Sequence, residues 1–163
     1  NGRPPQMLCG LGFSAQGLFE GSYYRRMPAA ADPRAAWIFD GIEDEVIGDF
    51  GLSGGGAAGF ELDRADFTLG TPPNTLILAR SEGHQSHFGT VPEELLSHLA
   101  TLNGERPKDL IRAEIVYFDM TAGGAVFSTG SITFCGSLSC NNYDNNVSRM
   151  LENVLRRFAG DHR

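Results

Sequence analysis

Two carboxylates two residues apart, Glu61 and Asp63, are the residues best placed for chemistry in this chain. They lie in the segment F60-E-L-D-R64, which has the composition of an extended segment. In a strand alternate side chains share a face, so the two carboxylates lie together and Phe60 and Leu62 point to the core. Mutual repulsion raises the pKa of one member of such a pair and suits the pair for general acid/base work. The residues alone favour a plainer interpretation, a salt bridge between Glu61 and Arg64 or another arginine.

The glycines just before this segment match a phosphate-binding pattern literally. Gly54, Gly56 and Gly59 fit G-x-G-x-x-G. The dinucleotide interpretation requires a helix directly after the glycines, because the helix N-terminus binds the pyrophosphate. The segment that follows is extended instead, so we favour a tight turn in which backbone approaches backbone. A third interpretation is that the glycines let a substrate approach the main chain.

A second polar group, R80-S-E-G-H-Q-S-H87, follows the most apolar run of the chain. In open α/β sheets ligands bind beyond the carboxyl ends of the strands, so we predict that Glu82 and His84 contact a substrate. Together with His87 they could also hold a metal, but a loop lacks the regular spacing of a helical histidine pair, and we predict no metal site. The plainer interpretation is a solvated loop.

No activated nucleophile is evident. Ser14 and Cys135 both lie near glycines, but neither fits the G-x-S-x-G turn of hydrolases that use a catalytic serine. We therefore predict no serine or cysteine triad.

Apolar runs and helical periodicity set the expected architecture. The run T75-L-I-L-A79 is typical of a strand buried on both faces of a parallel sheet. The other strand candidates are residues 37–39, 46–50, 115–118, 126–127 and 131–134. Leucines at helical spacing predict a helix over 92–104, and residues 1–35 read as loops with at most one short helix. Strands alternating with helices predict one α/β domain over 1–163.

The last predicted element is an amphipathic helix from about Asn145 to Ala159. Asn145 is a favourable N-cap residue, and the basic residues of the last turn oppose the helix dipole. One apolar stripe contains Val147, Met150, Leu151, Val154, Leu155 and Phe158. Of these, Val147, Leu151, Val154, Leu155 and Phe158 are expected to pack against the sheet.

Composition excludes several classes. The net charge of −7 would repel a polyanion, so no nucleic-acid partner is expected. No apolar run approaches the length of a membrane span. Three cysteines without CxxC spacing argue against a disulfide framework and favour a cytoplasmic protein.

Phrases spread over nearly the whole chain resemble the large, or beta, subunit of N,N-dimethylformamidase. They are G2-R-P-P-Q, D32-P-R-A-A-W-I-F39, D44-E-V-I-G-D-F-G-L52, G56-A-A-G-F-E-L-D-R64, L69-G-T-P-P73 and the block from Gly123 to Phe158. The chain would be the C-terminal part of that subunit. The resemblance implies a three-layer, glutamine-amidotransferase-like (Rossmann-like) α/β fold. It also implies as partners the rest of the large subunit, a small subunit and further copies.

The resemblance also implies an activity, the hydrolysis of small N-substituted formamides or amides. The family uses a mononuclear iron held by two tyrosines and a glutamate, in a segment preceding the part this chain resembles. We therefore expect no cofactor within this chain and iron in the full-length parent. The family has a further glutamate near the metal, and its best counterpart is Glu61, the predicted catalytic residue.

One departure concerns the loop before the last helix. The family tends to have S-H-N-G-Y-D-N where this chain has S139-C-N-N-Y-D-N145. The missing histidine removes a titratable group, and the substrate could differ from dimethylformamide. The chain alone is expected to be inactive. Two alternatives stay open: a non-catalytic structural or oligomerisation domain, and a small-molecule-binding module.

Overall fold

A computed structural model describes residues 2–91 and 106–160. The helix expected over 92–104 lies outside this described part. Within it, no helix is long and apolar enough to cross a membrane.

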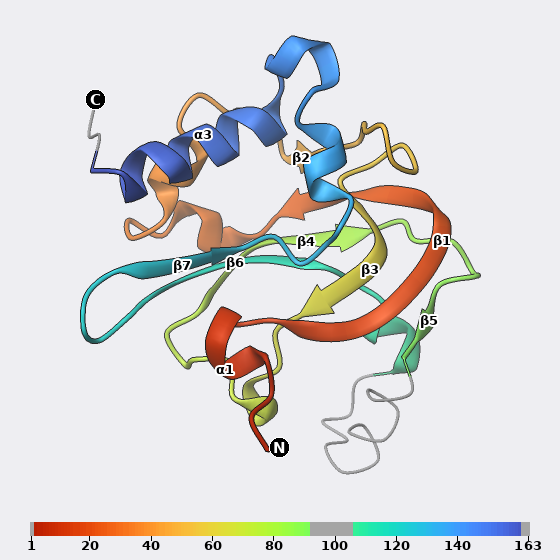
Figure 1. The fold of residues 1–163 in the computed structure, drawn as a ribbon, viewed down its shortest axis with the longest axis horizontal. Coiled ribbons are helices and arrows are strands. Elements are labelled where there is room, and N and C mark those ends of the chain that lie inside the picture. The colour runs from red at the N-terminus through yellow and green to blue at the C-terminus, as the bar shows by residue number, and fades with distance from the viewer. Residues whose placement is uncertain (1, 92–105, 161–163) are drawn as a thin grey trace.

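Over the residues that the structure describes, the fold is a curved antiparallel sheet, a half-barrel with two helices, and not the three-layer α/β fold that we expected (Figure 1). Its path runs β2-β1-β4-β6-β7, with β3 and β5 also paired to β1, and every pairing is antiparallel. The strands are β1 (Gly12–Arg26), β2 (Val46–Ile47), β3 (Ala58–Arg64), β4 (Leu76–Glu82), β5 (Gly89–Thr90), β6 (Glu114–Asp119) and β7 (Ala125–Ser128).

The apolar run of β4 explains why the sequence suggested a parallel sheet. Leu78 packs into the main core on one face, and Ile77 packs against a smaller cluster of Leu11, Ala65 and Val116 on the other. A strand covered on both faces is apolar throughout, whichever way its neighbours run. The prediction of two buried faces was right, and the inference of a parallel sheet was wrong.

β1 was not predicted at all, because residues 12–26 are rich in glycine and polar groups. It pairs with four other strands and curls around one side of the molecule (Figure 1). The register against β3 shifts between Gln16 and Gly21, so residues 17–20 bulge out of the ladder. Bulges increase the local bend of a strand, which accounts for the curl.

The helices among the described residues are α1 (Gln6–Cys9) and α3 (Asn146–Phe158). The start of α3 was predicted correctly: the Asn145 side chain accepts a hydrogen bond from Ser148 N at 2.9 Å. Its buried face was only partly predicted. Val147, Met150 and Val154 are buried, whereas Leu151 is half-buried and Leu155 and Phe158 are 59% and 48% exposed.

Short 3-10 turns make up much of the remainder. They span Pro28–Ala31, Ala36–Phe39, Phe67–Leu69, Pro107–Leu110, Phe134–Ser137 and Cys140–Tyr143. Two strand predictions were wrong. Residues 37–39 lie within a 3-10 turn, and residues 131–134 contribute only a single bridge between Leu62 and Ser131. The turn Ala36–Phe39 packs beside α3 and completes the core.

Candidate functional site

Glu61 and Asp63 lie on β3, as predicted, and line one pocket of about 550 Å³. Glu61 is exposed and Asp63 half-buried, whereas Leu62 between them is fully buried. Apolar side chains also line the pocket, among them Phe127, Ile132 and Leu151. The pocket therefore combines two carboxylates with an apolar surface.

The two carboxylates differ in their electrostatics. Burial, and to a lesser extent the charge of Glu61, raises the pKa of Asp63 to about 6. Glu61 has no hydrogen bond or ion pair within the described parts of the chain. The salt bridge that the sequence favoured is absent there, because Arg64 is buried and pairs with Asp66 at 3.1 Å.

A serine and a glycine from the segment after β7 fix the backbone around the pair. Ser131 Oγ accepts a hydrogen bond from Gly59 N at 2.8 Å and donates one to Gly59 O at 2.9 Å. Gly130 O accepts a hydrogen bond from Asp63 N at 2.8 Å. Gly130 has a φ of +67°, and an added Cβ would lie 2.4 Å from Glu114 O and 2.8 Å from Asp63 O. The bonds of Ser131 to Gly59 could not be predicted from local patterns, because they join residues 72 positions apart.

The glycine motif is a close backbone approach and not a phosphate loop. Gly54 O accepts a hydrogen bond from Gly21 N at 2.7 Å. A Cβ added at Gly56 or Gly59 would lie within 2.6 Å of a backbone oxygen of β1. The motif leads into strand β3 instead of a helix, so the tight-turn interpretation is confirmed and the dinucleotide one is wrong.

The residue before Glu61 has an unusual backbone. Phe60 has a φ of 60°, in the left-handed region that side chains other than glycine rarely adopt. It lies opposite the bulge of β1, where Phe19 has a φ of 68°. Both strands thus depart from extended geometry at the same level, and this sets the direction of the chain as it enters Glu61.

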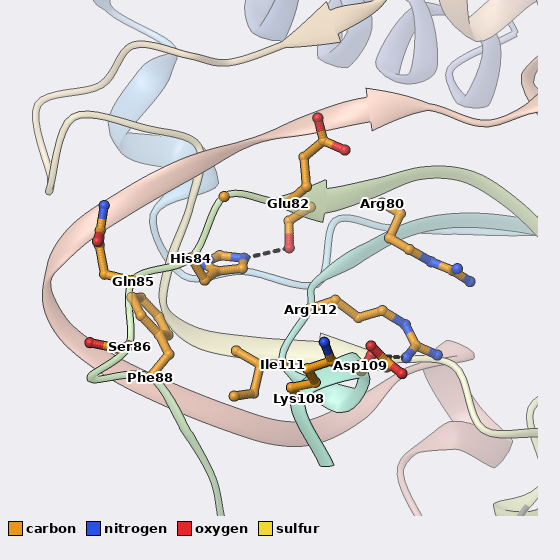
Figure 2. Close-up of a pocket in the computed structure, with 12 residues that line it drawn as sticks. Arg80, Glu82, His84, Gln85, Ser86, Phe88, Lys108, Asp109, Ile111 and Arg112 are labelled. Carbon is orange, nitrogen blue, oxygen red and sulfur yellow. Dashed lines mark hydrogen bonds between the residues drawn. The ribbon is translucent and has the colours of Figure 1, made fainter. Parts of the chain in front are cut away.

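Glu82 and His84 line a second pocket of about 630 Å³, which shares no lining residue with the first. Figure 2 shows the Glu82 side chain directed away from the His84 ring. Glu82 accepts a hydrogen bond from Arg25 Nε at 2.8 Å, which, with burial opposing it, lowers the pKa of that carboxyl. We predicted a catalytic role for Glu61 and substrate contacts for Glu82 and His84, and the structure places Glu61 in a different pocket from the other two.

The His84 ring is packed instead of open to solvent. Its Nε2 lies 2.6 Å from Ser81 Oγ, and its ring lies 4.7 Å from that of Phe88, centroid to centroid. Burial lowers its pKa to about 4, so the ring is neutral at physiological pH. Ser81 Oγ also accepts a hydrogen bond from Ala113 N at 2.7 Å. Through this bond Ser81 links β4 to the residue just before β6.

Neither the His, Cys, Asp and Glu side chains of the described residues nor the buried Tyr24 fits a metal centre. Within residues 2–91 and 106–160, no group of three or more histidine, cysteine, aspartate or glutamate side chains could hold a metal ion. Tyr24 is fully buried, its hydroxyl donates to Thr129 O at 2.6 Å, and burial raises its pKa far above the ordinary value. A phenol held in its protonated form is a poor metal ligand.

Comparison with known proteins identifies the family. Residues 1–145 match the family described as N,N-dimethylformamidase beta subunit-like, C-terminal. The chain is 52% identical over 161 residues to the N,N-dimethylformamidase beta subunit of Paracoccus aminophilus and 48% identical to that of an Alcaligenes species. Each match covers 98% of this chain but 21% of the relative, so the chain spans about a fifth of the length of these proteins. The chain belongs to the N,N-dimethylformamidase beta subunit family and corresponds to its C-terminal domain.

Proposed function

We propose that the chain is the C-terminal domain of an amide C–N hydrolase that acts on small N-substituted formamides or amides, and that Glu61 is its general base. The family match over residues 1–145 carries the proposal. Support from the geometry comes from the carboxylate of Glu61, which is exposed in a pocket and is not engaged by Arg64. A carboxylate so placed can accept a proton from a water that attacks an amide carbon.

The volume and lining of the pocket agree with a small, weakly polar substrate. Its volume of about 550 Å³ lies within the range of small-molecule sites. Phe127, Ile132 and Leu151 would contact N-alkyl groups, while the carbonyl and the attacking water would lie toward Glu61. The proposed role of Glu82 and His84 in binding substrate has weaker support, because Arg25 and Ser81 already engage them.

We propose that the rest of the beta subunit is the partner of this domain, and that it holds the iron. In the two relatives about four-fifths of the chain lies outside the matched part. The C-terminal half of α3 offers a surface for it: Leu138, Leu151 and Leu155 line an apolar groove beside Tyr143, which is 66% exposed. Leu151 also lines the pocket of Glu61, so a segment in this groove would border the site.

The three free thiols are compatible with a cytoplasmic protein.

The test is the variant Glu61→Gln in the full-length parent, assayed with N,N-dimethylformamide. The change keeps the shape and removes the charge, so kcat should fall by about 10²- to 10⁴-fold. Glu43→Gln is the matched control, because Glu43 is exposed and outside the pocket. Turnover near that of the control would make Glu61 a structural carboxylate and favour a scaffold role for the domain.

A further inference from the structure

The pocket holds a second carboxyl group, Asp63, that the general-base role of Glu61 does not use. Asp63 is half-buried, lies on the same face of β3 two residues away, and lines the same cavity. Its main-chain N–H is held by Gly130 O, so the position of the residue is fixed relative to the pocket. No hydrogen bond or ion pair involves its side chain within the described residues, so its proton is not committed to a neighbour.

We propose that Asp63 is the general acid of the same reaction, protonating the nitrogen of the departing amine. The inference rests on the proposed hydrolase function. It assigns a role that amide hydrolysis requires, because an alkylamine leaves poorly as its anion. A carboxyl group that keeps its proton beside an ionised one can supply it.

The proposed reaction has one proton transfer at each carboxyl group. Glu61 takes a proton from the attacking water while the new C–O bond forms and the carbonyl π electrons move to oxygen. Those electrons return as the C–N bond breaks, and Asp63 gives its proton to the leaving nitrogen. The products are the carboxylic acid and the neutral amine. Transfer of the proton from Glu61 to Asp63, directly or through water, restores the starting state.

The surroundings of Asp63 favour the protonated form. Burial is the larger cause of its raised pKa and the charge of Glu61 the smaller. The other titratable groups near it are Cys9 and Cys135, which line the pocket, and the phenol of Tyr24 on β1. None of these carries a positive charge in its ordinary state, and Arg64, the next residue along β3, is paired with Asp66. No cation that would hold Asp63 ionised lines this pocket among the described residues.

The test compares two leaving groups in the full-length parent carrying Asp63→Asn. N,N-dimethylformamide releases dimethylamine, whereas N-methylformanilide releases a far weaker base that needs less help from an acid. For the first, kcat should fall by about 10²-fold or more. For the second the loss should be at least tenfold smaller, and the high-pH limb of the rate profile should disappear with both. Asp63→Glu should restore part of the activity.

Asp49→Asn is the matched control, since Asp49 is an exposed carboxylate away from the pocket. An equal loss for both substrates would make Asp63 merely structural, and no loss beyond the control would exclude it from the reaction. Either result overturns the acid role while leaving Glu61 as the base. If the wild-type parent hydrolyses neither formamide, the proposed function falls and the acid role falls with it.

A carboxyl titration of the 163-residue chain gives a readout besides activity. With ¹³C-labelled aspartate, Asp63 should titrate near pH 6, and Glu61→Gln should lower that midpoint because it removes the neighbouring negative charge. A midpoint at the ordinary value for aspartate would overturn the proposal.

Discussion

Ser131 holds Gly59 by both of its backbone groups, accepting from the N–H at 2.8 Å and donating to the carbonyl at 2.9 Å. Gly59 immediately precedes Phe60, whose left-handed backbone leads into Glu61. Ser131 also bridges Leu62, on the far side of Glu61. One residue thus supports the chain on both sides of the proposed base.

Ser131→Ala should destabilise the protein by about 1–3 kcal/mol, because two partly buried backbone groups lose their partner. Urea unfolding measures the change. Ser86→Ala is the matched control, since Ser86 is exposed, and it should change stability by less than about 0.5 kcal/mol. In the parent, Ser131→Ala should lower kcat as well. If Ser131→Ala unfolds with the wild-type free energy, the backbone conformation at Gly59 does not depend on this hydroxyl.

Gly130→Ala should cost roughly 2–4 kcal/mol, combining an unfavourable backbone conformation with a clash against Glu114 O and Asp63 O. Gly124→Ala separates the two causes. Gly124 has a φ of +84°, but an added Cβ there has no neighbour within 4 Å. It should cost only about 1–2 kcal/mol. Equal losses of melting temperature in the two variants would contradict the close packing behind Asp63.

Two apolar residues of α3 differ in burial and allow a direct comparison. Met150 is fully buried, and Leu155 on the same helix is 59% exposed. Met150→Ala should cost about 2–5 kcal/mol in this chain, while Leu155→Ala should stay within about 0.5 kcal/mol. In the full-length parent we expect Leu155→Ala to become clearly destabilising, because the apolar groove would be covered there. If Leu155→Ala lowers the free energy of unfolding no more in the parent than in this chain, the proposal that the rest of the subunit covers the groove is contradicted.

The neutral, buried ring of His84 should lower the free energy of unfolding in mild acid. Its pKa is about 4 in the folded protein and about 6.5 in an unfolded chain. Between these values the unfolded state binds a proton that the folded state does not, so this contribution is complete above pH 6.5 and is lost as pH falls toward 4. Unfolding free energies at pH 7 and pH 4.5 test this, and the deficit of His84→Gln should shrink at the lower pH.

Protonation of Asp63 has the opposite effect on stability over part of that pH range. Its folded pKa is raised, so the folded state binds the extra proton and gains stability as pH falls from about 6 toward 4. The effect is common to the wild type and His84→Gln, and it cancels in their difference. A deficit that stays constant between pH 7 and pH 4.5 would mean that His84 is not buried as a neutral ring.

The parts of the site that could be predicted were local. The alternation of F60-E-L-D-R64 correctly placed Glu61 and Asp63 on one strand face, and Asn145 correctly marked the start of α3. Both follow from a few neighbouring residues, where backbone geometry alone decides which side chains share a face.

The parts that failed depend on distant contacts. β1 has too little apolar periodicity to be recognised, and its strand structure is stabilised by partners such as β3 and β4, far along the chain. The apolar run of β4 correctly indicated two buried faces but carried no information on strand direction. The role of Ser131 could not be found, because its partner Gly59 lies 72 residues away.

The order of the strands along β1 has a consequence for how the protein reaches its fold. Among the described residues, the four strands that pair with β1 all follow it in the chain, so during synthesis β1 is made before any of them exists. At ordinary rates of translation it stays unpaired for on the order of seconds, with Leu18 and Phe19 in its middle. Few of its contacts are local, and folding dominated by such distant pairings takes milliseconds to seconds even once the chain is complete. β1, which pairs with β2, β3, β4 and β5, is therefore exposed to misassembly while the protein is being made.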